Sequence, residues 1–150
     1  MNSLWSNDTL WLPISAAALV QIYKFISESI RDRQWSYEAL SRSGGMPSSH
    51  SAMVTSLATA VGHRAGVSSS EFAISIIFAI IVMYDASGVR QAAGKQAKVI
   101  NQIVRELFSG KPLSEETLKE LIGHTQFEVL VGAIVGLLFT YLAIWFGVGS

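Results

Sequence analysis

A run of 20 residues without a charged side chain, Val129–Val148, constrains this chain more than any other feature. About 20 apolar residues in an α-helix match the thickness of the hydrocarbon core of a bilayer. A helix also satisfies its backbone polar groups internally, as lipid requires. We therefore expect a membrane-spanning helix. Composition agrees, because half of the residues are hydrophobic and the mean hydropathy is +0.39. Only 15% are charged, whereas soluble domains carry about 25%.

Three further stretches have the pattern of membrane helices. The second of them is rich in small residues, which suit close packing between membrane helices. After the third, apolar residues alternate with Lys and Arg at helical spacing, which predicts an amphipathic extension outside the membrane or on its surface. A short connecting helix is expected at about Ser114–Gly123. The three stretches are Leu10–Ile30, Met46–Gly62 and Phe72 to about Arg90.

The predicted fold is therefore all-α: a single membrane domain over residues 1–150, with about four transmembrane helices forming a bundle. The 11 basic residues balance the 11 acidic ones, so no basic field exists to attract nucleic acid. The absence of cysteine excludes disulfides, thiolate zinc sites and iron–sulfur clusters. Basic residues concentrate in the loops after the first and third helices, which predicts cytoplasmic loops and external termini in the plasma membrane.

Polar and ionisable residues gather at one end of the predicted helices. Because successive helices alternate in direction, the ends of helices one and three lie on the same face as the starts of helices two and four. Ionisable residues at membrane depth are costly and are functional candidates by default. The set is Lys24, Arg31, Ser48, Ser49, His50, Asp85, Arg90, His124 and Glu128.

The cationic and hydroxyl members of this set suit a phosphate group. Lys24 and Arg31 are seven residues apart, so they share one helix face. Lys24 offers a compact ammonium charge, and Arg31 offers a planar guanidinium group with several donors. Ser48 and Ser49 open the second helix, where backbone N–H groups favour anions. These residues predict a phosphate-binding site.

The histidines suit phosphoryl transfer. His50 is placed to donate a proton, and Glu128 lies four residues after His124, where a carboxylate can orient the imidazole. One histidine can then attack phosphorus while the other protonates the leaving group. No three-residue cluster of histidines and carboxylates indicates a metal site. We expect no metal and no cofactor.

Structural roles compete with these interpretations. Lys24 and Arg31 can snorkel at a helix end, and Asp85 and Arg90 can form a structural ion pair. Thr125 to Glu128 fits a capping box, which is compatible with a catalytic role for Glu128. The remaining polar and small residues are expected to be structural: His63 as a surface histidine, and Gly132 and Gly136 as packing glycines.

Three motifs follow one another along the chain: Lys24-x6-Arg31, Pro47-Ser48-Ser49-His50 and His124-x3-Glu128. They resemble the motifs of the type 2 phosphatidic acid phosphatase superfamily, which also contains vanadium haloperoxidases. The phrases Ser43–Ala52, Tyr84–Arg90 and Gly123-His124-Thr125 look more closely like the divergent, haloperoxidase-related branch of that superfamily. The resemblance extends from about Lys24 to Gly136.

The resemblance implies roles for individual residues. His124 would be the nucleophile that forms a phosphohistidine, Glu128 its partner and His50 the general acid. Lys24, Arg31, Ser48 and Ser49 would hold the phosphate. The chain departs from the family pattern at four positions: Asp32 stands for Pro, Ser49 for Gly, Leu118 for the third-motif Arg, and Glu128 for Asp. Lys119 lies one residue from the missing Arg, and Arg90 is the candidate substitute.

The leading hypothesis is an integral membrane phosphatase that acts on a lipid phosphate or pyrophosphate at the cytoplasmic face. Its partners would be membrane lipid and a phosphorylated lipid or pyrophosphate substrate. One alternative is a non-catalytic membrane protein that binds or transports an anionic headgroup in the same pocket. Another is haloperoxidase chemistry, with vanadate in place of phosphate, although nothing in the sequence indicates a soluble oxidative enzyme.

Overall fold

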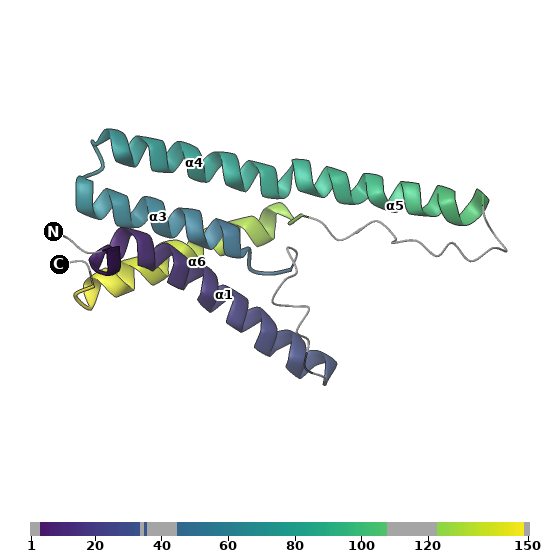
Figure 1. The fold of residues 1–150 in the computed structure, drawn as a ribbon, viewed down its shortest axis with the longest axis horizontal. Coiled ribbons are helices and arrows are strands. Elements are labelled where there is room, and N and C mark those ends of the chain that lie inside the picture. The colour runs from purple at the N-terminus through teal and green to yellow at the C-terminus, as the bar shows by residue number, and fades with distance from the viewer. Residues whose placement is uncertain (1–3, 34, 36–44, 108–122, 149–150) are drawn as a thin grey trace.

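The computed structural model describes residues 4–33, 35, 45–107 and 123–148, and every regular element within these ranges is a helix (Figure 1). The predicted short helix at Ser114–Gly123 falls almost entirely outside the described residues. The elements are a 3₁₀ turn at Leu4–Ser6 and the helices α1 (Asp8–Asp32), α3 (Ser49–Ala65), α4 (Ser70–Ser87), α5 (Val89–Leu107) and α6 (Gln126–Trp145).

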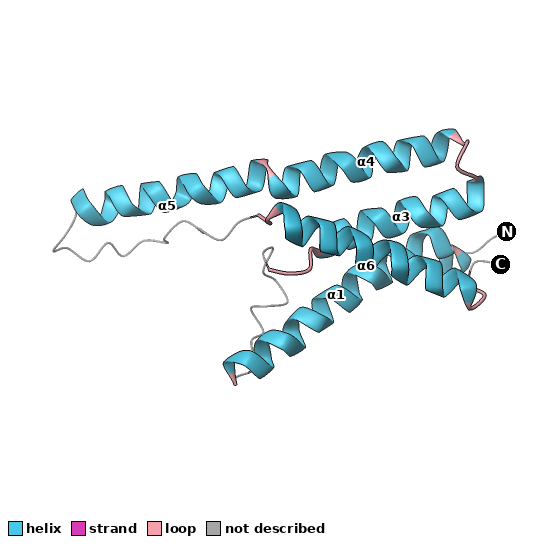
Figure 2. Cartoon of the chain, turned by 180° about the vertical axis from the view of Figure 1, so that it is seen from behind, coloured by secondary structure: helices cyan, strands magenta, loops and turns pink. Residues whose placement is uncertain are grey.

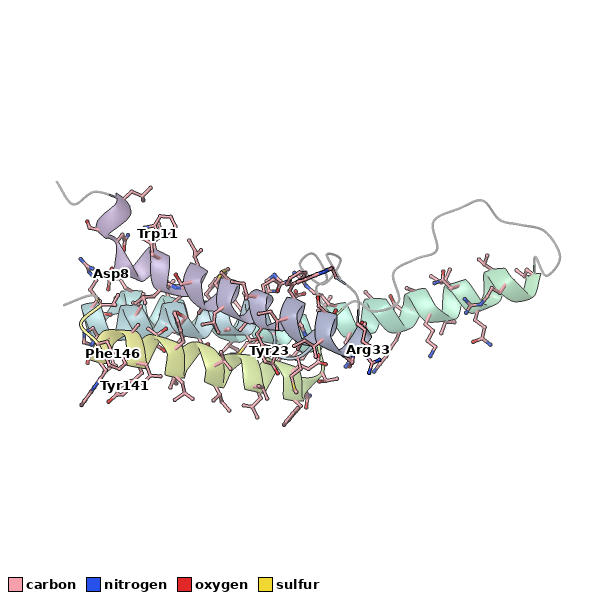
Figure 3. All side chains as sticks on the ribbon, turned by 90° about the horizontal axis from the view of Figure 1, so that it is seen from below. Asp8, Trp11, Tyr23, Arg33, Tyr141 and Phe146 are labelled. Atoms are coloured by element: carbon pink, nitrogen blue, oxygen red, sulfur yellow. The ribbon has the colours of Figure 1, made fainter. Side chains whose placement is uncertain are left out.

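The helices form a bundle in which α3 packs against α1, α4 and α6. α1, α3, α4 and α6 alternate in direction, and α5 continues along the direction of α4, so the start of α1 and the end of α6 lie at one end of the bundle (Figure 1). Figure 3 shows Asp8 and Phe146 at this end and Arg33 at the opposite end of α1. The ends of α1 and α4 and the starts of α3 and α6 therefore share one side, as the sequence predicts.

Small residues allow α3 to occupy the centre. A Cβ atom added at Gly132 would collide with the backbone of Ser48, and one at Gly136 with the backbone of Ala52. Both glycines of α6 are therefore packing glycines, as expected, and they let the two helix backbones approach closely. The interface also contains a hydrogen bond of 2.6 Å between the buried hydroxyls of Ser56 and Thr140.

The helical membrane bundle is confirmed. By length and composition, three helical segments of the described chain qualify to cross a membrane: α1, the run Ser70–Arg105 that contains α4, and α6. α3, the remaining expected span, has 17 residues and lies among the other helices. α4 exposes large apolar side chains such as Ile74 and Ile77, as a lipid-facing helix does.

Capping residues move the helix boundaries from their predicted positions. α3 begins at Ser49 because the Ser48 side chain caps it. α6 begins at Gln126 because Thr125 and Glu128 form the predicted capping box. α4 ends at Ser87, and Gly88 donates its N–H to the Tyr84 carbonyl oxygen. Arg90 therefore belongs to the first turn of α5 and does not close the third span. α5 is the helical extension that the sequence predicts.

Candidate functional site

Gly123 brings His124 into the bundle. Gly123 has a φ of +99°, a region that favours glycine, and a Cβ there would collide with the α5 backbone at Arg90 and Gln91. This close approach allows the His124 N–H to donate to the Ala86 carbonyl oxygen at 2.9 Å. The His124 residue is only 3% exposed. The junction between α4 and α5 thus anchors the histidine.

Glu128 orients the His124 ring. Its Oε2 lies 3.2 Å from His124 Nδ1 and accepts the Thr125 N–H at 3.0 Å. The capping box and the histidine–carboxylate contact therefore use the same oxygen. With Nδ1–H donating to the carboxylate, a neutral ring leaves Nε2 unprotonated. Among the described residues, this buried Nε2 has no hydrogen-bond partner.

The surroundings of His124 favour its neutral form. Burial lowers the pKa of His124 below its ordinary value of 6.5, because a buried imidazolium loses hydration. The hydrogen bond and charge of Glu128 raise it, while Lys24 and His50 lower it. A neutral imidazole with a free ring nitrogen is a nucleophile or a base.

The start of α3 is fastened to the first turn of α6. The Ser48 N–H donates to the Glu128 carbonyl oxygen at 3.1 Å. The buried Ser48 Oγ accepts the Ser51 N–H at 3.3 Å and the Ser51 hydroxyl at 3.0 Å. Ser48 is thus a helix cap, whereas Ser49 is half-buried and His50 is exposed in the first turn of α3.

Lys24 lies in this cluster. It is 2% exposed and interacts electrostatically with Glu128 and Glu28. Its charge also acts on both His50 and His124. Lys24 therefore does not snorkel to water, and it supplies a buried positive charge beside both histidines.

Arg90 and Asp85 form the ion pair that the sequence allowed. Arg90 Nε donates to Asp85 Oδ2 at 2.6 Å, and both side chains are partly exposed. Both charges act on His50. The pair therefore lies near His50, at the edge of the cluster. Since Nε is only one of the donors of a guanidinium group, the ion pair leaves other N–H groups of Arg90 for a ligand.

Two predicted residues are not placed in the cluster. Arg31 bonds with the adjacent Asp32, with Nε 2.9 Å from Oδ1, and its side chain is 69% exposed. The end of α1 that carries it diverges from the other helices (Figures 1 and 2). Lys119 lies outside the described residues. Within the described ranges, no group of three or more histidines and carboxylates is placed to hold a metal ion.

Sequence reasoning missed the contribution of backbone groups. Gly123 and the Ala86 carbonyl oxygen hold His124, and Ser51 completes the hydrogen bonds of Ser48. The sequence signal for the close approach at His124 was the glycine that immediately precedes this histidine. No pattern in one sequence indicates which carbonyl oxygen accepts the histidine N–H.

The fold and this cluster define a helical membrane protein with a histidine–carboxylate pair beside a buried lysine. The chain belongs to the Divergent PAP2 family, which matches residues 5–139. It is similar to "Uncharacterized membrane protein YuiD" of Bacillus subtilis (strain 168), with 38% identity over 154 aligned residues. The alignment covers 95% of this chain and 98% of that protein. No solved structure matches the chain.

Proposed function

We propose that this protein is an integral membrane phosphatase that hydrolyses a lipid phosphate or pyrophosphate through a phosphohistidine intermediate. The observation that carries the proposal is His124, whose buried ring turns Nδ1 toward Glu128 and leaves Nε2 without a partner among the described residues. Membership in the Divergent PAP2 family supports a phosphatase-related membrane protein. The phosphatase activity itself is our inference from the site.

The reaction has two displacements at phosphorus. In the first, His124 Nε2 forms a bond to phosphorus, the bond to the leaving oxygen breaks, and His50 gives that oxygen a proton. In the second, the oxygen of water bonds to phosphorus, the bond between phosphorus and His124 Nε2 breaks, His50 takes the proton from water, and inorganic phosphate leaves. Glu128 stabilises the charge that develops on the ring when Nε2 reacts. Lys24 and Arg90 stabilise the charge on the phosphoryl oxygens.

The remaining phosphate contacts come from the start of α3. Ser49 is half-buried there, at a helix N-terminus whose N–H groups favour an anion. Ser48 and Arg31 have no role in this proposal, since the cap uses Ser48 Oγ and Arg31 pairs with Asp32. The family's third-motif arginine has no equivalent at Leu118, so Arg90 takes its place.

A second candidate function is binding or transport of an anionic headgroup without catalysis. One observation favours it: several of the predicted phosphate ligands are engaged within the protein. Asp85 neutralises Arg90, and the His124 residue is almost completely buried. A cluster of these groups can bind a phosphate without delivering it to the ring nitrogen.

Purified protein in nanodiscs separates the two functions. The substrates are a lipid phosphate and a lipid pyrophosphate, each radiolabelled on the terminal phosphate. The phosphatase releases inorganic phosphate and, on rapid quenching, retains an acid-labile, alkali-stable label that is lost in His124→Ala. Saturable binding without release or protein labelling would instead establish a binding protein. His63→Ala, a change at the exposed histidine at the other end of the bundle, is the matched control.

We also propose that the site opens to the cytoplasm from the plasma membrane. The positive-inside rule supports this orientation, because most Lys and Arg residues lie in the loops on the side of the site. The chain lacks cysteine, so Ser69→Cys and Lys98→Cys each introduce a single thiol. An impermeant maleimide should label the first in intact cells and the second only after lysis. The reverse pattern would invert the topology.

A further inference from the structure

Helix α5 separates apolar and basic residues onto opposite faces. Four of its large apolar side chains are spaced by 11, 3 and 4 residues, which are close to three turns, one turn and one turn of the helix. Basic residues occupy other positions around the helix, and Glu106 is the one acidic residue in the α5 sequence. Val89, Ile100, Ile103 and Leu107 make up the apolar face, and they are between 47% and 73% exposed.

The length of this helix takes it out of the hydrocarbon core. α4 and α5 together form the 36-residue run Ser70–Arg105. At 1.5 Å per residue the run is about 54 Å long, whereas the core is about 30 Å thick. Figure 2 shows α5 extending beyond the ends of the other helices. With α4 in the hydrocarbon core, most of α5 lies beyond the acyl chains, which then leave its apolar face uncovered.

Gly88 separates the two helices. Its φ of −107° and ψ of −80° depart from helical values of about −63° and −42°. A glycine permits a change of direction at low cost at such a junction. α5 is therefore connected to a spanning helix through a residue that can redirect it.

We propose that α5 docks on the anionic surface of the membrane on the side of the site. Its apolar face, made by Val89, Ile100, Ile103 and Leu107, enters the boundary between headgroups and acyl chains. Lys95 and Lys98 attract anionic headgroups and keep their ammonium groups in water. A lipid surface is the occupant because α5 starts beside it, and because its sequence carries four basic residues against one acidic residue. This proposal is independent of phosphatase activity.

The test measures the depth of single spin labels on the full chain in nanodiscs. The label is attached through Ile103→Cys on the apolar face or Lys98→Cys on the opposite face, with Ile77→Cys in α4 as the lipid-facing reference. In discs of equal parts phosphatidylcholine and phosphatidylglycerol, the Ile103 label should collide several-fold more with oxygen than with a water-soluble nickel chelate. The Lys98 label should show the opposite preference. In pure phosphatidylcholine the contrast between the two positions should decrease.

The charge requirement is tested with the double variant Lys95→Glu, Lys98→Glu. It should restore access of the nickel chelate to the Ile103 label in phosphatidylglycerol discs, while the Ile77 label is unchanged. Three results would overturn the proposal. The Ile103 label is as open to nickel as the Lys98 label in anionic discs, which means that α5 stands in water. It is shielded from both reagents, which means that protein covers the face. The third result is that the double variant leaves the accessibility of the Ile103 label unchanged, which means that anionic lipid does not hold α5.

Discussion

The two ends of the bundle have similar side chains in different surroundings. At the end with the termini, Asp8, His63 and Arg64 line one shallow hollow, where the histidine and the arginine are exposed. At the other end, His124 is buried and its Nδ1 faces Glu128. Each end thus offers a histidine, a carboxylate and an arginine. Among the described residues, a hydrogen bond to the imidazole is seen at the end with His124.

Backbone contacts make the difference. At the site end, Gly123 allows His124 to reach the junction of α4 and α5, and Gly132 brings α6 against Ser48. Each contact would be blocked by a single Cβ. At the other end, the Cβ of a residue at Gly62 would meet the ring of Phe72, which is a side chain and not backbone. Residue types alone therefore do not distinguish the ends, whereas burial and backbone fit do.

The largest expected effect separates the two histidines. His124→Ala should lower phosphatase turnover by about 10⁴-fold or more, as removal of a nucleophile does in other enzymes. His63→Ala should retain the wild-type rate, since its ring is exposed at the opposite end. Phosphate release from nanodiscs measures both. Equal rates for the two variants would remove the distinction between the ends.

The next largest effect on turnover separates Arg90, at the site, from Arg64, at the other end. Arg90→Ala should lower turnover by about 10²-fold, the scale for one lost stabilising donor in a transition state. Arg64→Ala should have no effect on turnover. A KM measured with each variant separates lost binding from lost catalysis. If Arg90→Ala is fully active, the arginine serves only its ion pair with Asp85, as the structural interpretation holds.

The sequence was sufficient to predict the four bundle helices α1, α3, α4 and α6 and the end at which the polar residues meet. Alternating apolar runs define the direction of each helix, and direction alone brings Lys24, His50 and His124 to one side. It did not place Arg31. The helical period puts Lys24 and Arg31 on one face, but the end of α1 diverges from the bundle, and Arg31 bonds with Asp32. Helix periodicity describes one helix and not its path relative to its neighbours.

The junctions also lay beyond sequence reasoning. Gly88 ends α4, so Arg90 extends from a separate helix. Ser48, predicted as a phosphate ligand, uses its hydroxyl to cap α3. A local hydrogen bond sets the start of α3, and non-helical dihedral angles at Gly88 set the end of α4. Such local features shift boundaries without changing the apolar pattern.

The pH dependence of turnover tests the burial of His124. The nucleophile is the neutral ring, so the rate rises with pH as the imidazolium loses its proton. Because burial lowers the pKa of His124, this rising limb should lie below pH 6.5. Glu128→Gln removes a charge that raises the pKa, so the limb should move to still lower pH, with a lower maximal rate. A limb above pH 6.5 would mean that burial does not control the pKa of His124.

The smallest expected effect concerns the two glycines. Gly132→Ala places a Cβ against the backbone of Ser48, which cannot rotate away, so the starts of α3 and α6 must separate. Overpacking of this kind costs about 1–3 kcal/mol. The separation should also stretch the bond from the Ser48 N–H to the Glu128 carbonyl oxygen and reduce turnover.

Gly62→Ala is the matched change at the other end. Its Cβ meets the Phe72 ring, which can shift, and replacing a glycine within a helix gains about 1 kcal/mol. Thermal unfolding in nanodiscs should therefore show a lower Tm for Gly132→Ala and a nearly unchanged Tm for Gly62→Ala. Turnover measured below both transitions should fall only in Gly132→Ala, because only that substitution acts on the start of α3, next to His50. Equal losses of turnover would mean that general loosening of the bundle, and not the fit of α3 against α6, controls the site.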